Sequence, residues 1–157
     1  MSFKEGHLNF VYLSPPKNRY KMPDNFLKTA TRMYDSSKIL HRENHSFNAC
    51  YLSGYVAECY AKIMLELATG TLIRTHDISE ILRLIPPFFI NSPAHNKYWI
   101  DLPIQCPKMY SGVAKWNPLK RYSDSCSWDT ATSAAFQREM DICFDKITEM
   151  RLDGIIR

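Results

Sequence analysis

The sequence predicts an all-α protein, an up-and-down bundle of four to five helices with a long loop rich in proline and aromatic residues before the last helix. Two long segments, 46–69 and 129–152, repeat apolar residues every three or four positions, as one buried helix face requires. No segment shows the alternation of apolar and polar residues that is typical of a strand. The length of 157 residues fits a single domain over 1–157, with an N-terminal arm over 1–22 and the bundle over 24–152.

The first helix is expected at about residues 24–42. Pro23 and Asp24 form a suitable start, because proline fits the first helical turn and an acidic side chain is favoured near the N-terminal end of the helix dipole. The inward face then follows at spacings of three and four: Leu27, Ala30, Tyr34 and Ser37.

The second helix is the clearest element and is expected at about 46–69, with Ser46 as its cap and Gly70 at its C-terminal end. Glu58 and Lys62 form an i,i+4 pair on it, which is worth a few tenths of a kcal/mol where such a pair is exposed. The apolar stripe of this helix is Ala49, Leu52, Val56, Cys59, Ile63 and Leu67.

A short third helix is expected at about 76–85. Thr75 is a candidate cap, and Pro86 and Pro87 end the helix because proline lacks the backbone donor and disfavours helical geometry in the residue before it. Its apolar positions are Ile78, Ile81, Leu82 and Ile85.

Residues 86–128 are expected to form a long loop, with a short helix near 95–101 or 107–114. A loop of this length in a compact domain is often functional.

The last helix is expected at about 129–152, capped by Asp129 or Thr130 and ending near Gly154. Its apolar residues step by four, three, four and three: Phe136, Met140, Cys143, Ile147 and Met150.

Charge and cysteine usage narrow the function classes. The net charge of +4 is too small for the dense basic stripe of a dedicated duplex binder, but it is compatible with an anionic partner such as RNA. The five cysteines include no C-x-x-C pair, which argues against a disulfide framework and a structural zinc site. Cys50, Cys59 and Cys143 lie on apolar helix faces and are expected to be buried.

The expected location is the cytoplasm. The N-terminus has no secretory signal pattern, and no stretch approaches the ~18 apolar residues that span a bilayer. The absence of a disulfide pattern is consistent with a reducing compartment. We expect no membrane contact and no cofactor. We also expect no metal, because His41 and His45 have the i,i+4 spacing of two metal ligands but no third ligand is evident.

The nearest approach to a basic cluster lies in the long loop, where Lys120, Arg121 and Tyr122 follow Lys115 and Trp116. An arginine can fork to a phosphate, and aromatic rings can stack on bases, so Trp116, Lys120 and Arg121 are predicted binding residues. The alternative is that Arg121 bonds a helix C-terminus and the aromatic rings fill the core.

Two further pairs could carry chemistry. His76 and Asp77 could act as an acid–base pair or could simply start a helix. Glu58 and Lys62 could line a polar cleft as binding residues, or they could form a structural ion pair. The sequence has no glycine-rich phosphate loop and no Gly-x-Ser-x-Gly elbow, which argues against a P-loop or Rossmann enzyme and against an α/β-hydrolase.

Three segments resemble the HEPN (higher eukaryotes and prokaryotes nucleotide-binding) family in order and spacing. Residues 53–62, Ser-Gly-Tyr-Val-Ala-Glu-Cys-Tyr-Ala-Lys, are similar to its second-helix signature, and Thr75-His76-Asp77-Ile78 to the opening of its third helix. Residues 116–123, with their Arg-Tyr pair, resemble the segment ahead of its last helix. The resemblance that these three segments define extends over roughly residues 24–152.

The resemblance implies a bundle that is often dimeric. Many HEPN members are metal-independent RNases with an Arg followed, after four to six residues, by His, and this sequence has no such pair. The resemblance, without this Arg–His pair, therefore implies a non-catalytic binding or interaction module that is expected to be a homodimer. Its partner would be RNA, a nucleotide or a protein such as a nucleotidyltransferase or toxin, in a toxin–antitoxin or defence system.

Two alternatives stay open. One is a divergent metal-independent endoribonuclease, with Arg121, Tyr122 and His76 as weak catalytic candidates. The other is a small helical immunity or antitoxin protein that blocks a partner.

Overall fold

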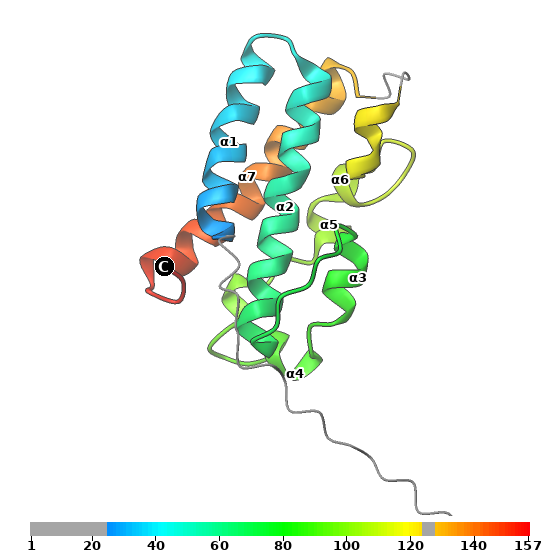
Figure 1. Ribbon diagram of the computed structural model, residues 1–157. Helices are drawn as coiled ribbons and strands as arrows, with labels where there is room; N and C mark the ends of the chain where they lie inside the picture. Colours follow the sequence, from blue (N-terminus) through cyan, green and yellow to red (C-terminus); the bar gives the residue numbers. More distant parts are fainter. Residues whose placement is uncertain (1–24, 124–127) are drawn as a thin grey trace, which may run out of the picture.

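The structure is a computed structural model that describes residues 25–123 and 128–157 (Figure 1). Its long helices are α1 (Phe26–Arg42), α2 (Ser46–Thr69) and α7 (Thr130–Leu152). Between α2 and α7 the described chain forms short helices and two 3₁₀ turns: α3 (Ile78–Arg83), α4 (Pro87–Ile90), η1 (Asn96–Tyr98), α5 (Leu102–Gln105), α6 (Pro107–Tyr110) and η2 (Pro118–Tyr122). The described residues contain no strand, so the all-α prediction is confirmed.

The three long helices lie side by side. A tight turn through Asn44, with φ 62°, reverses the chain between α1 and α2. The start of α7 lies beside the start of α2, where the Ser46 hydroxyl donates to Thr130 Oγ1 at 3.2 Å, and its end lies beside the start of α1. α7 therefore runs parallel to α2, and the short helices between them return the chain along the other side of α2 (Figure 1).

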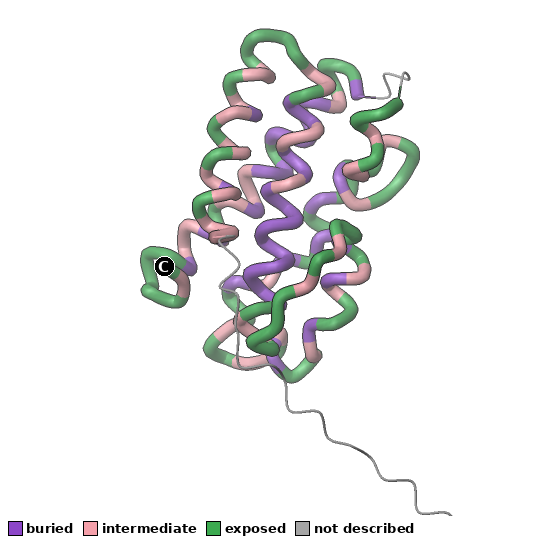
Figure 2. Tube along the Cα trace, viewed as in Figure 1, coloured by how far each residue is buried: buried purple, intermediate pink, exposed green. Residues whose placement is uncertain are grey.

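α2 is the core of the bundle and is buried on most of its circumference (Figure 2). Of the predicted stripe, Ala49, Val56, Cys59 and Ile63 are buried, whereas Leu52 and Leu67 are partly exposed. Residues outside that stripe, such as Tyr60 and Met64, are also buried, because α1 and α7 cover one side of α2 and α3 the other.

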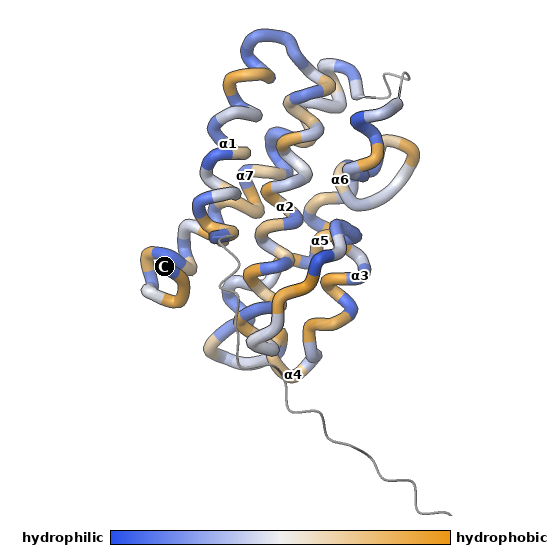
Figure 3. The backbone as a smooth tube through the Cα atoms, in the orientation of Figure 1, coloured by the Kyte–Doolittle hydropathy of each residue, from blue (hydrophilic) through white to orange (hydrophobic). Residues whose placement is uncertain are grey.

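α7 buries every apolar residue predicted for its inward face. Phe136, Met140, Cys143, Ile147 and Met150 are each 0% exposed. Hydrophobic residues lie along α2 and in the region of α3 and α4, while α1 is largely hydrophilic (Figure 3). The amphipathic pattern of the sequence therefore located the core correctly.

The observed helix starts correct two predicted caps. α2 begins at Ser46 as predicted, but His45 is the cap position, and the Ser46 hydroxyl bonds to α7 instead. α3 begins two residues later than predicted, because Asp77 rather than Thr75 caps it through the amides of Ser79 and Glu80. A carboxylate two residues nearer the helix reaches these amides directly.

α1 begins at Phe26, two residues later than predicted. The Asn25 side chain caps it by accepting from the Lys28 amide at 3.0 Å. The predicted start at Pro23 and Asp24 and the predicted arm over 1–22 lie outside the described residues, as does Cys126.

The proline-rich segment is not one long loop. Pro87, Pro107 and Pro118 each occupy the first position of a short helix or turn. Proline is favoured there, since the first amides of a helix have no partner within it. Prolines therefore start three of the five short elements that the structure describes between 86 and 123. One helix near 95–101 or 107–114 was expected, and η1 and α6 lie at these two places.

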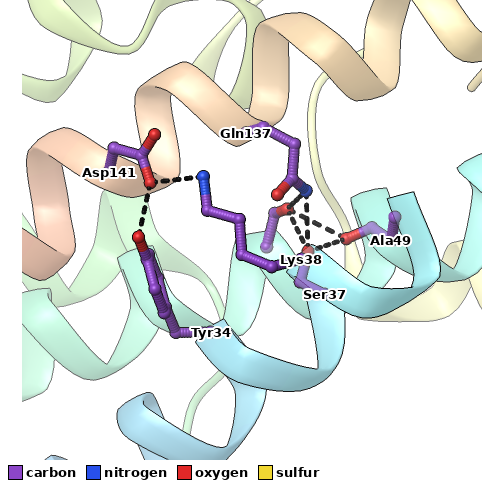
Figure 4. Close-up of polar contacts among 7 residues, drawn as sticks. Tyr34, Ser37, Lys38, Ala49, Gln137 and Asp141 are labelled. Atoms are coloured by element: carbon purple, nitrogen blue, oxygen red, sulfur yellow. Dashed lines mark hydrogen bonds and ion pairs between the residues drawn. The ribbon is translucent and has the colours of Figure 1, made fainter. Parts of the chain in front are cut away.

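A buried polar cluster joins the three long helices (Figure 4). The Gln137 amide donates to the hydroxyls of Ser37 and Ser53, and both serines donate to the Ala49 carbonyl. These bonds satisfy the serines that let α1 approach α2 closely.

Nearer the surface, Asp141 bridges α7 to α1 (Figure 4). Its carboxylate accepts from the Tyr34 hydroxyl at 2.9 Å and pairs with Lys38 at 2.6 Å. Burial, together with this carboxylate, raises the pKa of Tyr34 to about 12.

The buried cysteines agree with prediction: Cys50, Cys59 and Cys143 are buried, and Cys106 joins them. Burial raises the pKa of Cys50 to about 12, as expected for a thiol that packs rather than reacts. No described helix is long and apolar enough to cross a membrane.

Asp129 caps α7, and its removal should weaken the fold. Its side chain accepts from the Thr132 amide at 2.7 Å, and this hydrogen bond lowers the pKa of Asp129 below its ordinary value of 3.8. We expect Asp129→Ala to lower the Tm by several degrees at neutral pH. Thermal unfolding followed by circular dichroism measures this.

The pH dependence of that effect has a definite sign. A carboxyl with a lowered folded pKa adds stability above its ordinary value, and the contribution is lost as pH falls through the lowered value. The Tm difference between wild type and Asp129→Ala should therefore shrink below about pH 3.8. Asp129→Asn, which keeps a cap without the charge, should lie between the two proteins at neutral pH. A difference that is constant from pH 7 to pH 3 would contradict the cap.

Candidate functional site

A cleft of about 250 Å³ lies between the start of α3 and the chain from α6 to η2. Polar and basic side chains face each other across it. Its polar lining from the α3 side is His76, Asp77 and Ser79, and from the facing side Lys115 and Asn117, with Trp116 and Tyr110 beside them.

His76 is held by a buried carboxylate from α2. Its Nδ1 lies 3.0 Å from both oxygens of Glu58, whose side chain is 5% exposed. The imidazole itself is 54% exposed and lines the cleft. Because an ionised carboxylate only accepts, Nδ1 donates, and Nε2 is the ring nitrogen that remains available.

Lys62 of α2 also pairs with the Glu58 carboxylate that contacts His76. Its ammonium is 2.8 Å from Glu58 Oε1, its side chain is 9% exposed, and it lies over the Phe26 ring at 5.6 Å. The pair is thus buried, which favours the structural ion pair over the binding role, the two possibilities that the sequence analysis left open for Glu58 and Lys62. Glu58 also holds the Nδ1 side of His76.

Trp116 anchors the cleft's far wall to α2. It is 6% exposed, its Nε1 donates to the Tyr51 carbonyl at 2.9 Å, and its ring meets the Tyr55 ring edge-on at 5.1 Å. A ring packed in this way cannot stack on a base, so the structure favours the core-filling role that was the alternative for this residue.

Gly54 is what allows the tryptophan to pack so closely. A Cβ at this position would overlap the Cδ1, Cγ and Nε1 atoms of Trp116. Glycine in the middle of a helix costs about 1 kcal/mol relative to alanine. Here the missing side chain makes room for the indole, which explains a glycine at the centre of α2.

Arg121 is connected to the residues around Glu58 and Trp116 by two tyrosines of α2, Tyr51 and Tyr55. Tyr51 and Tyr55 share a hydrogen bond between their hydroxyls at 2.9 Å, and Arg121 bonds Tyr51. Burial first, and then Tyr51 and Glu58, raise the pKa of Tyr55, while the charge of Arg121 lowers it. Tyr55 thus lies between the Glu58–His76 pair and the guanidinium.

The outer edge of this surface is formed by η2. Arg121 is exposed and lies over the Tyr122 ring at 4.7 Å, and Tyr122 is 72% exposed. The neighbouring Tyr122 and Tyr51 hydroxyls raise the pKa of Arg121, which keeps it charged. A cation and an open aromatic ring therefore lie together beside the cleft.

Lys120 faces other partners. Its ammonium donates to the Val113 carbonyl at 3.4 Å and lies over the Trp128 ring at 5.4 Å. Of the predicted residues, His76 and Trp116 line the cleft, and Arg121 and Tyr122 follow the cleft-lining Pro118 and Leu119 in η2. Glu58 and Lys62 do not line the cleft and connect to it through the contact of Glu58 with His76.

The sequence analysis did not name Tyr51 and Tyr55, which lie next to the site. Their spacing was a usable signal, since positions 51, 55, 58 and 62 are spaced by four, three and four and so share one face of α2. Lys115 was named in the basic cluster but not among the binding residues, and its place in the cleft depends on how the chain folds back after α6.

No metal site emerges at the histidine pair. His41 bonds the Ser133 hydroxyl at 2.9 Å, and no three His, Cys, Asp or Glu side chains gather among the residues that the structure describes.

Comparison with known families supports the resemblance. The family model of the HEPN domain matches residues 24–105, more than half of the chain, and this match includes α1, α2 and α3. The Arg-Tyr segment lies beyond it. No curated protein and no solved structure matches the chain.

Proposed function

From the premise that this chain belongs to the HEPN family of nucleotide-binding and RNase-like modules, we propose that it binds a short single strand of RNA without cutting it. The observation that carries this proposal is that His76 and Lys115 line one cleft, while Arg121 and Tyr122 lie in the turn η2, whose Pro118 and Leu119 also line it. We call His76, Lys115, Arg121 and Tyr122 the cleft edge.

The cleft edge offers the two contacts that single-stranded RNA uses. Arg121 and Lys115 are exposed cations that can bind backbone phosphates, and Arg121 presents a planar fork for two phosphate oxygens. Tyr122 leaves most of its ring open for a base, and stacking of this kind is worth about 1–3 kcal/mol. The cleft of about 250 Å³ beside them can admit one further base or sugar.

The absence of cutting rests on the proton-transfer groups. Cleavage at a 2′-hydroxyl needs one group to take a proton and another to give one to the leaving oxygen. Within the described lining of the cleft, His76 is the only histidine, and its Nδ1 is engaged with Glu58. Asp77 also lines the cleft, but its carboxylate is engaged with the Ser79 and Glu80 amides as the cap of α3. His76 alone can bind a phosphate or the edge of a base, but it does not supply both proton transfers.

We expect Arg121→Ala to weaken binding of a fluorescent single-stranded oligonucleotide about tenfold, because one charged fork to phosphate is lost. Tyr122→Ala should weaken it by a similar factor through loss of stacking. Fluorescence anisotropy at low salt measures both. The Tm should stay within about two degrees of wild type, since both side chains are exposed.

Arg83→Ala is the matched control, because Arg83 is an exposed arginine of α3 that does not line the cleft. Equal losses in Arg83→Ala and Arg121→Ala would mean that RNA binds by general charge alone. A large drop in Tm for Arg121→Ala would instead favour a structural role.

The Glu58–His76 pair favours one alternative, a metal-independent endoribonuclease. Nε2 of His76 would take the proton of a 2′-hydroxyl, whose oxygen attacks the adjacent phosphorus. The 5′-oxygen would leave with a proton from water, and Arg121 would stabilise the added negative charge. This alternative requires strand scission without metal that His76→Asn abolishes.

Other expectations from the resemblance remain predictions. HEPN domains act in dimers or with other proteins, and a homodimer, a nucleotidyltransferase or toxin partner, and a role as an immunity or antitoxin protein in a defence system are all compatible with the fold. A tight complex with the product of an adjacent reading frame would identify a protein partner. A cytoplasmic location likewise stays a prediction.

A further inference from the structure

A second charged surface lies where the N-terminal half of α1 meets the C-terminal end of α7 (Figure 1). It is a broad groove of about 610 Å³. The basic side chains that line it are Lys28, Arg32, Arg151 and Arg157, and Asp35 is the one carboxylate side chain in its described lining. We call this surface the basic groove.

The four cations of the basic groove are all exposed, and no ion pair within the described chain neutralises them. By contrast, Lys38 is paired with Asp141 and Lys146 with Glu149. A concave surface with an excess of positive charge attracts an anionic partner.

A second hollow of about 330 Å³ adjoins the basic groove and shares Asn25, Leu27 and Arg157 with it. Its lining from α1, α2 and the chain after α7 is of mixed polarity: Phe26, Ile63, Leu67, Ile155 and Ile156 supply apolar surface, and Glu66 supplies one carboxylate. Leu152, next to Arg151, is 81% exposed. Apolar and basic surfaces are therefore continuous here.

This combination distinguishes a peptide from a nucleic acid. No aromatic side chain lines the basic groove, so the bases of a strand would have no stacking platform there. The hollow accepts aliphatic side chains, which a sugar–phosphate backbone lacks. We infer that this face docks an acidic, leucine-containing segment of a partner protein, with its carboxylates over the basic groove and its apolar side chains in the hollow.

The chain's own N-terminal segment does not complement this surface. Residues 1–24 carry four basic and two acidic side chains, so their charge has the same sign as the groove. The inferred site is also distinct from the cleft edge, because the two surfaces share no lining residue.

The test uses the full-length protein and a short fluorescein-labelled peptide of glutamate and leucine. We expect binding at low salt, measured by anisotropy, that Arg32→Glu with Arg151→Glu weakens at least about tenfold. Arg83→Glu with Arg138→Glu is the matched control, since both arginines are exposed and line neither surface, and it should change the affinity less than about twofold. Arg121→Ala should leave peptide binding unchanged whether or not the cleft edge binds RNA.

Three outcomes would overturn the inference. The first is no peptide binding at low salt, or an equal loss in both double variants. The second is a labelled single-stranded RNA that binds in place of the peptide and is lost in Arg32→Glu with Arg151→Glu. The third is a change of oligomeric state in that variant, measured by sedimentation, with no peptide binding by wild type, which would identify a second copy of the chain as the occupant.

Discussion

Replacing Glu58 by alanine is expected to cost about 3–5 kcal/mol of the free energy of unfolding, because it leaves the buried ammonium of Lys62 without its partner. Both side chains are nearly enclosed, at 9% exposure for Lys62 and 5% for Glu58. The same change frees the His76 ring, whose Nδ1 contacts both Glu58 oxygens. Chemical denaturation measures the free energy.

Two controls separate the charge effect from simple loss of volume. Glu149→Ala removes the acid of the Lys146–Glu149 pair, whose side chains are 30% and 39% exposed, and should cost less than about 1 kcal/mol. Glu58→Met combined with Lys62→Met removes both charges and should be more stable than Glu58→Ala. If the double variant is the less stable of the two, the buried charge is not the cause.

Gly54→Ala is expected to destabilise the protein by about 1–3 kcal/mol, although alanine is the better helix former. The added Cβ would overlap the Trp116 ring, which is enclosed between α2 and the cleft. The indole must move outward and lose its bond to the Tyr51 carbonyl. We expect a red shift in tryptophan emission and weaker RNA binding, because the wall that carries Lys115 moves with Trp116.

A double-mutant cycle identifies the cause. In a Trp116→Ala background the overlap is gone, so Gly54→Ala should be neutral or stabilising there. An equal loss in both backgrounds would show that the indole is not what requires glycine. A Gly54→Ala protein as stable as wild type would contradict the packing of Trp116 against α2.

The long helices were predictable from sequence because their information is local. The apolar steps in 46–69 and 129–152 place residues on one face wherever the helix packs, and Gly70 adopts the left-handed φ expected of a C-terminal glycine. Asp129, one of the two caps proposed for the last helix, bonds the amide expected of it. Such contacts span only three or four residues.

The short helices and the cleft could not be predicted in the same way. The start of α6 is held by the Glu139 carboxylate, which accepts from the Lys108 and Met109 amides, 31 and 30 positions away in the sequence. Glu139 lies on α7, and burial raises its pKa while these bonds lower it. No local pattern in the sequence shows this pairing between α7 and α6.

For the candidate residues, too, the sequence showed the local pattern but not the contacts that depend on the fold. Glu58 and Lys62 were recognised as an i,i+4 pair, but whether it is buried depends on α1 and α3 covering α2. His76 was recognised as polar at a helix start, and its bond to Glu58 needed the fold. Sequence alone therefore named most members of the site, and of the two roles it left open for Trp116 the burial of the ring favours core filling.

The most direct test of the proposed function incubates labelled single-stranded RNA with the full-length protein in excess chelator. A native gel reads the complex, and a denaturing gel reads the length of the RNA. We predict a complex that Arg121→Ala weakens, with the RNA intact at high protein concentration. Cleaved RNA, with cleavage absent in His76→Asn, would contradict the account and identify a metal-independent nuclease; no complex at all would remove the cleft edge as an RNA site.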